Sequence, residues 1–141
     1  MPRFMLLMIP TGLSDEDWGE GPSADDVGEM MKFNEALTQA GVLLALDGLH
    51  PSSKGARITS AGGKKTVTDG PFTEAKELVG GYWVIDVKSK DEAVEWATRC
   101  PLGDGDILEV RQVAELSEFP EDVQAVAQLS QEPPEQTSAR R

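Results

Sequence analysis

The sequence contains a single histidine, His50, in the segment LHPSSKG. An imidazole has an unperturbed pKa near neutrality, so His50 is the natural candidate for a general acid or base. A later carboxylate, Asp69, begins the tetrapeptide Asp-Gly-Pro-Phe at residues 69–72. Catalytic dyads use such a carboxylate to orient an imidazole. We therefore predict that His50 moves protons and that Asp69 orients it, as the catalytic residues of a small enzyme.

Both residues also have a purely structural interpretation. His50 can be an ordinary histidine of a surface loop, and Asp69 can be a turn residue whose carboxylate accepts backbone N–H groups around Gly70, with Pro71 fixing φ. The two interpretations differ in geometry. Catalysis requires that His50 and Asp69 come within hydrogen-bond reach of each other in a concave pocket.

A basic stretch surrounds these two residues in an otherwise acidic chain. The formal net charge is −12, yet the segment 50–73 has one acidic residue, Asp69, against four basic ones: Lys54, Arg57, Lys64 and Lys65. A locally positive surface attracts small anions, so we predict that three of these residues bind a carboxylate or phosphate of the substrate: Lys54, Arg57 and Lys65. The alternative is a solvated hairpin edge, on which lysines discourage aggregation.

Two aromatic residues near this stretch, Phe72 and Tyr82, are predicted to form a wall against the same small molecule. The alternative is that they belong to the core, as aromatic residues beside a sheet usually do.

Several classes of function are disfavoured by composition. The strongly negative charge argues against binding nucleic acid, whose phosphates favour basic surfaces. No apolar run approaches the roughly 20 residues of a membrane-spanning helix, and MPRFMLLMIP lacks a signal-peptide cleavage site. The one cysteine, Cys100, excludes an internal disulfide. No phosphate loop, metal-ligand cluster or nucleophile elbow is present, so we expect no metal or cofactor. The expected location is the cytoplasm.

The elements that must position these residues follow from periodicity and turn chemistry. Strands are predicted at 3–9, 42–49, 82–87 and 106–113, with Gly48 marking a bulge or bend. ARITS and KKTVT around Ala61-Gly62-Gly63 predict a hairpin, and TEAKEL at 73–78 predicts a short helical turn. Helices are predicted after the caps Ser23 and Ser89.

Side-chain spacing assigns the faces of these elements. The strand at 82–87 alternates, with Trp83, Ile85 and Val87 on one face. The second helix has a small apolar stripe: Ala93, Trp96, Ala97 and Cys100. The first helix has its own periodic set: Val27, Met30, Met31, Asn34 and Leu37. Trp18, isolated in an acidic loop, is expected to fold back on the domain.

The order β-α-β, inserted hairpin, β-α-β predicts an α+β fold, a ferredoxin-like sandwich, over residues 1–118. Two helices cover one face of such a sheet, so the other apolar face predicts a homodimer packed sheet to sheet. Residues 119–141 form an acidic C-terminal extension. Here FPEDVQAVAQL predicts a short helix, and SQEPPEQTSARR predicts a disordered tail.

The segment VTDGPFTEAKELVGGYWVIDVKSKDEAVEWATRCP closely resembles the YCII-related (YciI-like, DGPF) domain family. AGVLLALDGLHPSSKGARI and ILEVRQV extend the resemblance to residues 3–118. It implies a dimeric α+β barrel, in which ferredoxin-like protomers pair through their sheets. A His–Asp pair is the proposed active site of YciI-like members, with the histidine on the first helix. This chain has Met30, Met31, Lys32 and Asn34 there instead.

Two functions follow as hypotheses. The first is a cofactor-independent lyase or isomerase that acts on a small polar or anionic molecule in a cleft at the dimer interface. The second is a non-catalytic module that binds a ligand or a protein, as the frequent association of family members with transcription regulators implies.

Overall fold

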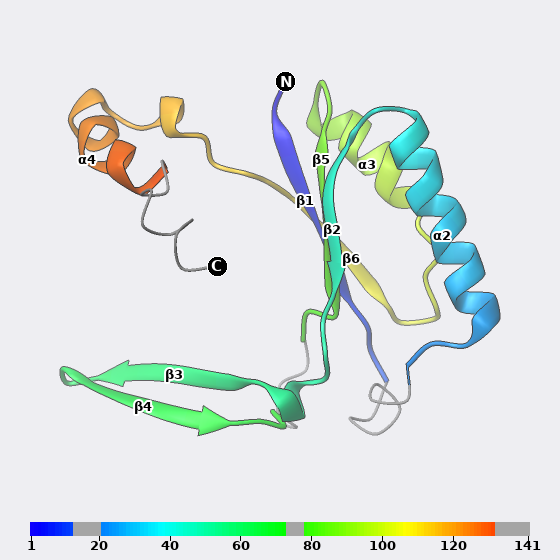
Figure 1. Cartoon of the computed structure of the whole chain (residues 1–141), viewed down its shortest axis with the longest axis horizontal. Coiled ribbons are helices and arrows are strands. Elements are labelled where there is room, and N and C mark those ends of the chain that lie inside the picture. The colour runs from blue at the N-terminus through cyan, green and yellow to red at the C-terminus, as the bar shows by residue number, and fades with distance from the viewer. Residues whose placement is uncertain (13–20, 73–77, 132–141) are drawn as a thin grey trace, which may run out of the picture.

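Four antiparallel strands form the main sheet of the computed structural model, which describes residues 1–12, 21–72 and 78–131 (Figure 1). Their order across the sheet is β2 (Leu43–Gly48), β5 (Gly81–Asp86), β1 (Arg3–Ile9) and β6 (Ile107–Gln112). The predicted α+β class is confirmed, and this order is compatible with the ferredoxin-like fold.

Of the two alternatives predicted for Gly48, a bulge or a bend, the bulge lies elsewhere in β2. The register of β2 against β5 shifts between Leu43 and Ala45, whereas Gly48 pairs regularly with Gly81. A Cβ atom on Gly81 would lie 2.9 Å from the carbonyl oxygen of Asp47, so this glycine allows a close approach of two backbones.

Two helices, α2 (Ala24–Gln39) and α3 (Lys90–Thr98), lie on one face of the sheet (Figure 1). Both predicted caps are confirmed: the Ser23 hydroxyl accepts the N–H of Asp26, and the Ser89 hydroxyl accepts the N–H of Glu92. These bonds satisfy amides that a helix start would otherwise leave unpaired.

The core lies between this face and the two helices. The sheet contributes alternating buried residues: Phe4 and Leu6 from β1, and the predicted set Trp83, Ile85 and Val87 from β5 and the residue after it. The stripe of α3 is also confirmed, with Ala93, Ala97 and Cys100 buried and Trp96 packed against them.

The predicted inner face of α2 needs a correction. Val27 and Met31 are exposed, whereas Phe33 is buried beside Leu37. The Phe33 ring packs edge to face on Trp83, with 5.5 Å between the ring centres, and Asn34 Oδ1 accepts the Trp83 indole N–H at 2.7 Å. Met30, Asn34 and Leu37 lie on the inner side as predicted, and Phe33 brings an aromatic ring to Trp83 there.

The predicted hairpin, β3 (Ala56–Ala61) and β4 (Lys64–Asp69), is a separate two-stranded sheet that projects from the domain (Figure 1). We call it the arm. A short 3₁₀ turn, η1 (Ser52–Lys54), precedes it.

After β6 the chain forms a second 3₁₀ turn, η2 (Leu116–Glu118), and helix α4 (Glu121–Gln131). Helix α4 confirms the helix predicted at the start of the C-terminal extension. Three predictions fall largely or wholly outside the described residues: the turn at 73–78, the placement of Trp18 and the disordered tail.

Candidate functional site at the base of the arm

The base of the arm is a junction of two segments, 49–55 and 69–72. The Gly70 N–H donates to the Gly55 carbonyl at 3.0 Å, and the Phe72 N–H donates to the Ser52 hydroxyl at 3.1 Å. The ladder of the arm begins at the same level, where Ala56 pairs with Asp69. These bonds hold the loop after His50 against the Asp-Gly-Pro-Phe segment.

Gly70 is required by packing at this junction. A Cβ atom there would overlap the backbone carbonyl of Ser52. The following peptide bond, Gly70–Pro71, is cis. The glycine of the tetrapeptide thus has a structural role, and Asp69 is exposed beside it.

His50 lies beside this junction, at the end of β2. The Leu49 N–H donates to the Gly80 carbonyl at 2.8 Å, which extends the β2–β5 pairing past the last residue of the strand. His50 and Asp69 are both exposed, and no hydrogen bond or ion pair joins them within the described part of the chain. Their segments therefore meet at one site, while the catalytic dyad stays a prediction.

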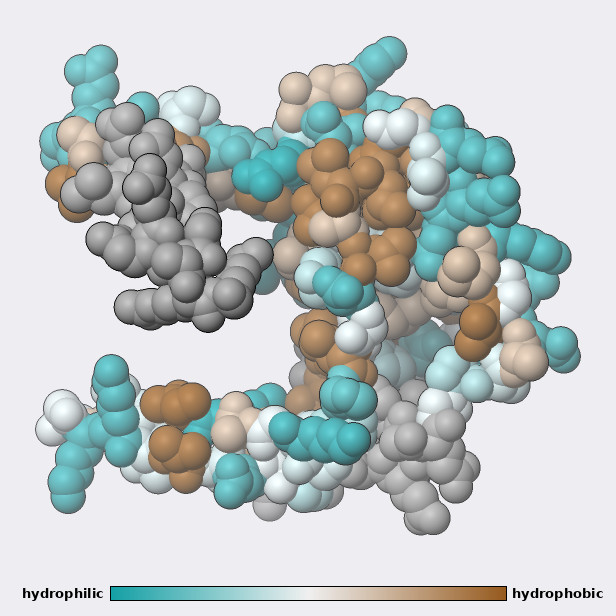
Figure 2. Space-filling model, viewed as in Figure 1, coloured by the Kyte–Doolittle hydropathy of each residue, from teal (hydrophilic) through white to brown (hydrophobic). Residues whose placement is uncertain are grey.

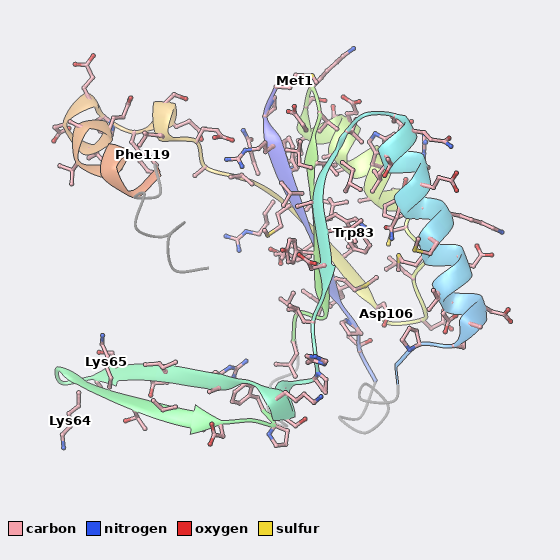
Figure 3. All side chains as sticks on the ribbon, in the orientation of Figure 1. Met1, Lys64, Lys65, Trp83, Asp106 and Phe119 are labelled. Atoms are coloured by element: carbon pink, nitrogen blue, oxygen red, sulfur yellow. The ribbon has the colours of Figure 1, made fainter. Side chains whose placement is uncertain are left out.

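The predicted anion-binding residues divide into two groups. The Arg57 guanidinium lies 4.2 Å from the centre of the Phe72 ring, a cation–π contact that fixes both side chains at the base of the arm. Lys54 ends η1 and lies at the same base. Lys65 is instead near the free end of the arm (Figure 3), four residues or about 13 Å along the strand from Asp69.

Tyr82 lies on the sheet face opposite the helices, where its hydroxyl donates to Asp47 Oδ2 at 2.7 Å. The hydrogen bond to Asp47, reinforced by its negative charge, raises the pKa of Tyr82 above the ordinary value. No pattern in the sequence selects Asp47, because its pairing with Tyr82 depends on the strand register. Tyr82 thus presents its ring and hydroxyl on this face opposite Asp47, which precedes His50 by three residues in the chain.

A separate hollow of about 740 Å³ lies between the N-terminus of α2 and the loop before β6. Its walls include Met8, Met30, Asp26 and Asp106, but none of the predicted site residues. Asp106 is already engaged, since its carboxylate accepts the N–H groups of Thr11 and Gly103 at 3.0 Å. The hollow is therefore distinct from the base of the arm.

Among the described residues, no group of three or more His, Cys, Asp or Glu side chains is arranged to hold a metal ion. In the same part of the chain, no helix has the length and apolar character needed to cross a membrane.

A four-stranded antiparallel sheet, two helices on one face and an arm closed by Asp-Gly-Pro-Phe define a small α+β domain. Residues 4–117 match the YCII-related domain, and the chain belongs to this family, which confirms the resemblance noted from the sequence.

A curated relative from Rhizobium meliloti (strain 1021), the uncharacterized protein R00369, is 30% identical over 80 residues. The match covers 57% of this chain but 64% of the relative, so it spans less than two thirds of that protein.

Proposed function

We propose that this YCII-domain protein is a homodimer that binds a small polar or anionic organic molecule where the base of the arm meets the partner subunit. The main support for this site is the junction at the base of the arm. One backbone hydrogen bond, one hydrogen bond to the Ser52 hydroxyl and the Arg57–Phe72 contact join the loop after His50 to the segment that begins with Asp69, with a cation and an aromatic ring at the joint.

The open face of the sheet supports the dimer. Both α2 and α3 lie on the opposite side (Figure 1), and residues that alternate with the buried core residues point away from the helices. These include the apolar residues Met5, Leu7 and Val84, which are half-buried in the single chain. An apolar sheet face is stabilised when a second copy covers it.

The chemistry proposed for the site is cofactor-independent proton transfer, of the kind a lyase or isomerase performs. Arg57 and Lys54 would hold the substrate anion against Phe72 and Tyr82. His50 would then accept a proton from the substrate and return it, with Asp69 orienting the imidazole. Closure by the partner would exclude water from a site that is exposed in the single chain.

A non-catalytic binding module is the second candidate, favoured by the exposure of His50 and by the lack of a bond from it to Asp69 in the described chain. In that case Arg57 and Phe72 would hold the ligand and His50 would contribute no more than a contact.

The first experiment measures the Tm of the dimer against a panel of small carboxylates and organic phosphates at millimolar concentration. A ligand at 100 times its Kd stabilises by about 2.7 kcal/mol, which raises Tm by several degrees. We expect Arg57→Gln to abolish this rise. The matched control is Lys90→Gln, which removes one exposed positive charge at the start of α3. An unchanged rise in Arg57→Gln would exclude the site.

The stabilising compound then separates the two candidates. Conversion of the compound by the wild-type protein, lost in His50→Gln while the Tm rise persists, supports the enzyme. A Tm rise without any conversion by the wild type supports the binding module.

A further inference from the structure

The arm exposes apolar side chains that do not pack on the core formed by the described residues. Ile58 and Val67 are directly paired across β3 and β4, so both lie on one face of the arm, with exposed fractions of 62% and 65%. Figure 2 shows brown, hydrophobic atoms exposed on the arm. An isolated two-stranded hairpin is marginally stable in water. The arm therefore needs an apolar surface from elsewhere.

Helix α4 likewise exposes apolar side chains that would be stabilised by packing against another surface. Phe119, Val123 and Val126 are exposed around it, Val126 by 79%, and the buried core includes no described residue of this helix. Val123 and Val126 are three residues apart and therefore lie on one side of the helix. A helix of 11 residues is marginal in water without packing.

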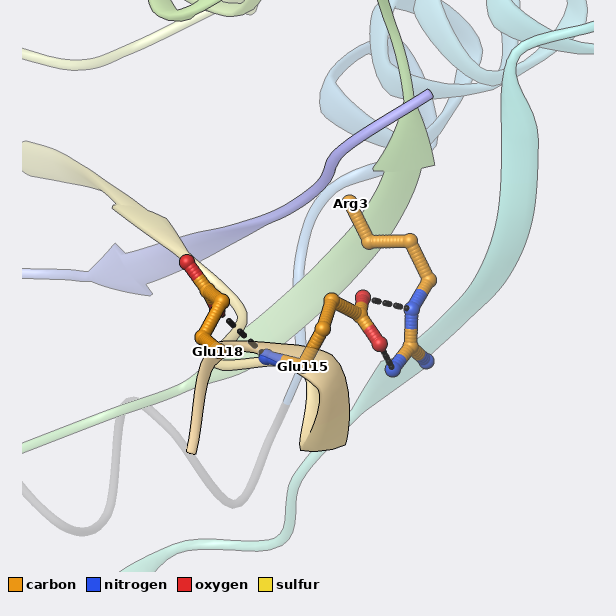
Figure 4. Close-up of polar contacts among 3 residues, drawn as sticks. All are labelled: Arg3, Glu115 and Glu118. Atoms are coloured by element: carbon orange, nitrogen blue, oxygen red, sulfur yellow. Dashed lines mark hydrogen bonds and ion pairs between the residues drawn. The ribbon is translucent and has the colours of Figure 1, made fainter. Parts of the chain in front are cut away.

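The segment that leads to α4 is nevertheless fixed to the domain. Arg3 on β1 binds Glu115 with two hydrogen bonds, Nε to Oε1 at 2.8 Å and Nη2 to Oε2 at 3.0 Å (Figure 4). The Glu118 carboxylate accepts the Glu115 N–H at 2.6 Å. These bonds fix the start of η2 beside β1, and α4 begins six residues after Glu115, away from the sheet (Figure 1).

The arm and α4 project to the same side of the sheet, away from α2 and α3 and from opposite ends of the sheet (Figure 1). A second copy placed against this side by a two-fold axis has two ways to meet them. One orientation stacks arm on arm, and the other places the arm of each copy against α4 of its partner.

Charge distinguishes the two orientations. The arm carries Arg57, Lys64 and Lys65 against Asp69, whereas residues 115–131 carry no basic residue and four acidic ones: Glu115, Glu118, Glu121 and Asp122. Stacking arm on arm would bring two positive surfaces together. Placing the arm against α4 joins opposite charges around two apolar patches.

We propose that the arm of one copy packs against helix α4 of a second copy, with Ile58 and Val67 on the apolar side of α4 and the arm cations beside Glu121 and Asp122. The proposal rests on the homodimer proposed above and specifies its orientation. Because the exchange occurs twice in a symmetric dimer, each copy is clasped by two contacts in addition to the sheets.

Chemical cross-linking tests the proposed contact directly. Full-length Ile58→Cys and Val126→Cys proteins, with tags of different length, are mixed until their subunits exchange and then treated with a short bis-maleimide. Cys100 provides little background because it is buried, and wild-type protein measures that background. We expect a cross-linked heterodimer on a denaturing gel as the main product.

Three results would overturn the proposal, and they differ. Cross-links in Ile58→Cys alone would show arm on arm. A dimer by sedimentation that forms no cross-link in the mixture would leave the sheet dimer standing without the clasp. A wild-type monomer would refute the dimer and the clasp together.

Charge reversal provides an independent test. We expect Lys64→Glu with Lys65→Glu, or Glu121→Lys with Asp122→Lys, to weaken dimerisation by about tenfold each, measured as Kd by sedimentation equilibrium. Combining all four substitutions should restore the wild-type Kd. Failure of the combination to restore it would contradict the pairing of arm with α4.

Discussion

At the residue scale, the Asp-Gly-Pro-Phe segment combines two separable roles. Gly70 fits because no Cβ atom can be placed against the Ser52 carbonyl, and Phe72 is held by Arg57 and by the Ser52 hydroxyl. Asp69 is exposed at the end of β4. The segment therefore builds the junction through Gly70 and Phe72, while the Asp69 side chain is not part of these contacts.

Replacing Gly70 by alanine should separate the two segments of the junction. We expect Gly70→Ala to lower the free energy of unfolding by about 1–3 kcal/mol, because the added methyl group meets a backbone atom that cannot rotate away. Urea unfolding followed by circular dichroism measures the change. Gly48→Ala is the matched control, since a Cβ atom there meets nothing within 4 Å. Equal effects at the two glycines would contradict this packing role.

Cys100 should be chemically silent in the folded protein. Burial, with a smaller contribution from the negative charge of Asp106, raises the pKa of this thiol to about 12. The thiolate is the reactive form, so alkylation by iodoacetamide at pH 8 should be at least about a hundredfold slower in the native protein than in urea. Val126→Cys supplies an exposed thiol in the same chain as the fast reference. Rapid native labelling of Cys100 would contradict the burial.

At the element scale, local signals predicted most of what was found. Serine caps, strict alternation in β5 and the small-residue stripe of α3 each depend on contacts within a few residues, and each is confirmed. Phe33 was missed from the inner face of α2 because it is selected by Trp83, which lies on a strand distant in the sequence, whereas Asn34, the other residue that contacts Trp83, was in the predicted set. The direction of the arm likewise depends on bonds between residues 52–55 and 70–72, which no local pattern encodes.

The Arg3–Glu115 pair should make the C-terminal segment sensitive to acid. The hydrogen bonds from Arg3 hold the pKa of Glu115 below its ordinary value of 4.5. A carboxyl group with a lowered folded pKa stabilises the fold above 4.5, and this contribution is lost as the pH falls through the lowered value. We expect Glu115→Gln to lower Tm at pH 7 and to make no difference well below pH 4.

The exposed pair of Glu29 and Lys32 on α2 provides the control. Glu29→Gln should leave the difference between Tm at pH 7 and at low pH nearly unchanged, because this carboxyl group lies in an exposed pair on one helix. A pH dependence of Tm in Glu115→Gln identical to that of the wild type would show that the tether does not contribute to stability.

At the scale of the whole molecule, the segments that come together at the base of the arm were predicted correctly from the sequence. The pairs of side chains that contact each other were predicted less well. The His50 loop and the Asp-Gly-Pro-Phe segment do come together, since the hairpin between them brings its two ends to one place. Lys65 was grouped with Arg57 from charge alone, but the extended arm separates them. Asp47 was missed because its partner Tyr82 becomes adjacent only through the register of β2 and β5.

The open face of the sheet leads to the last prediction, that dimerisation depends on side chains in its centre. Val84 lies on β5 between the buried residues Trp83 and Ile85, so it points to the face without helices. Placing a charge there would put two lysines from the symmetric copies into an apolar interface, where they have no partner. We expect Val84→Lys to be a folded monomer at micromolar concentration by sedimentation velocity. Val94→Lys makes the same change on the exposed side of α3 and should remain a dimer. A dimeric Val84→Lys, or a wild type that is itself monomeric, would show that the sheet face is not the interface.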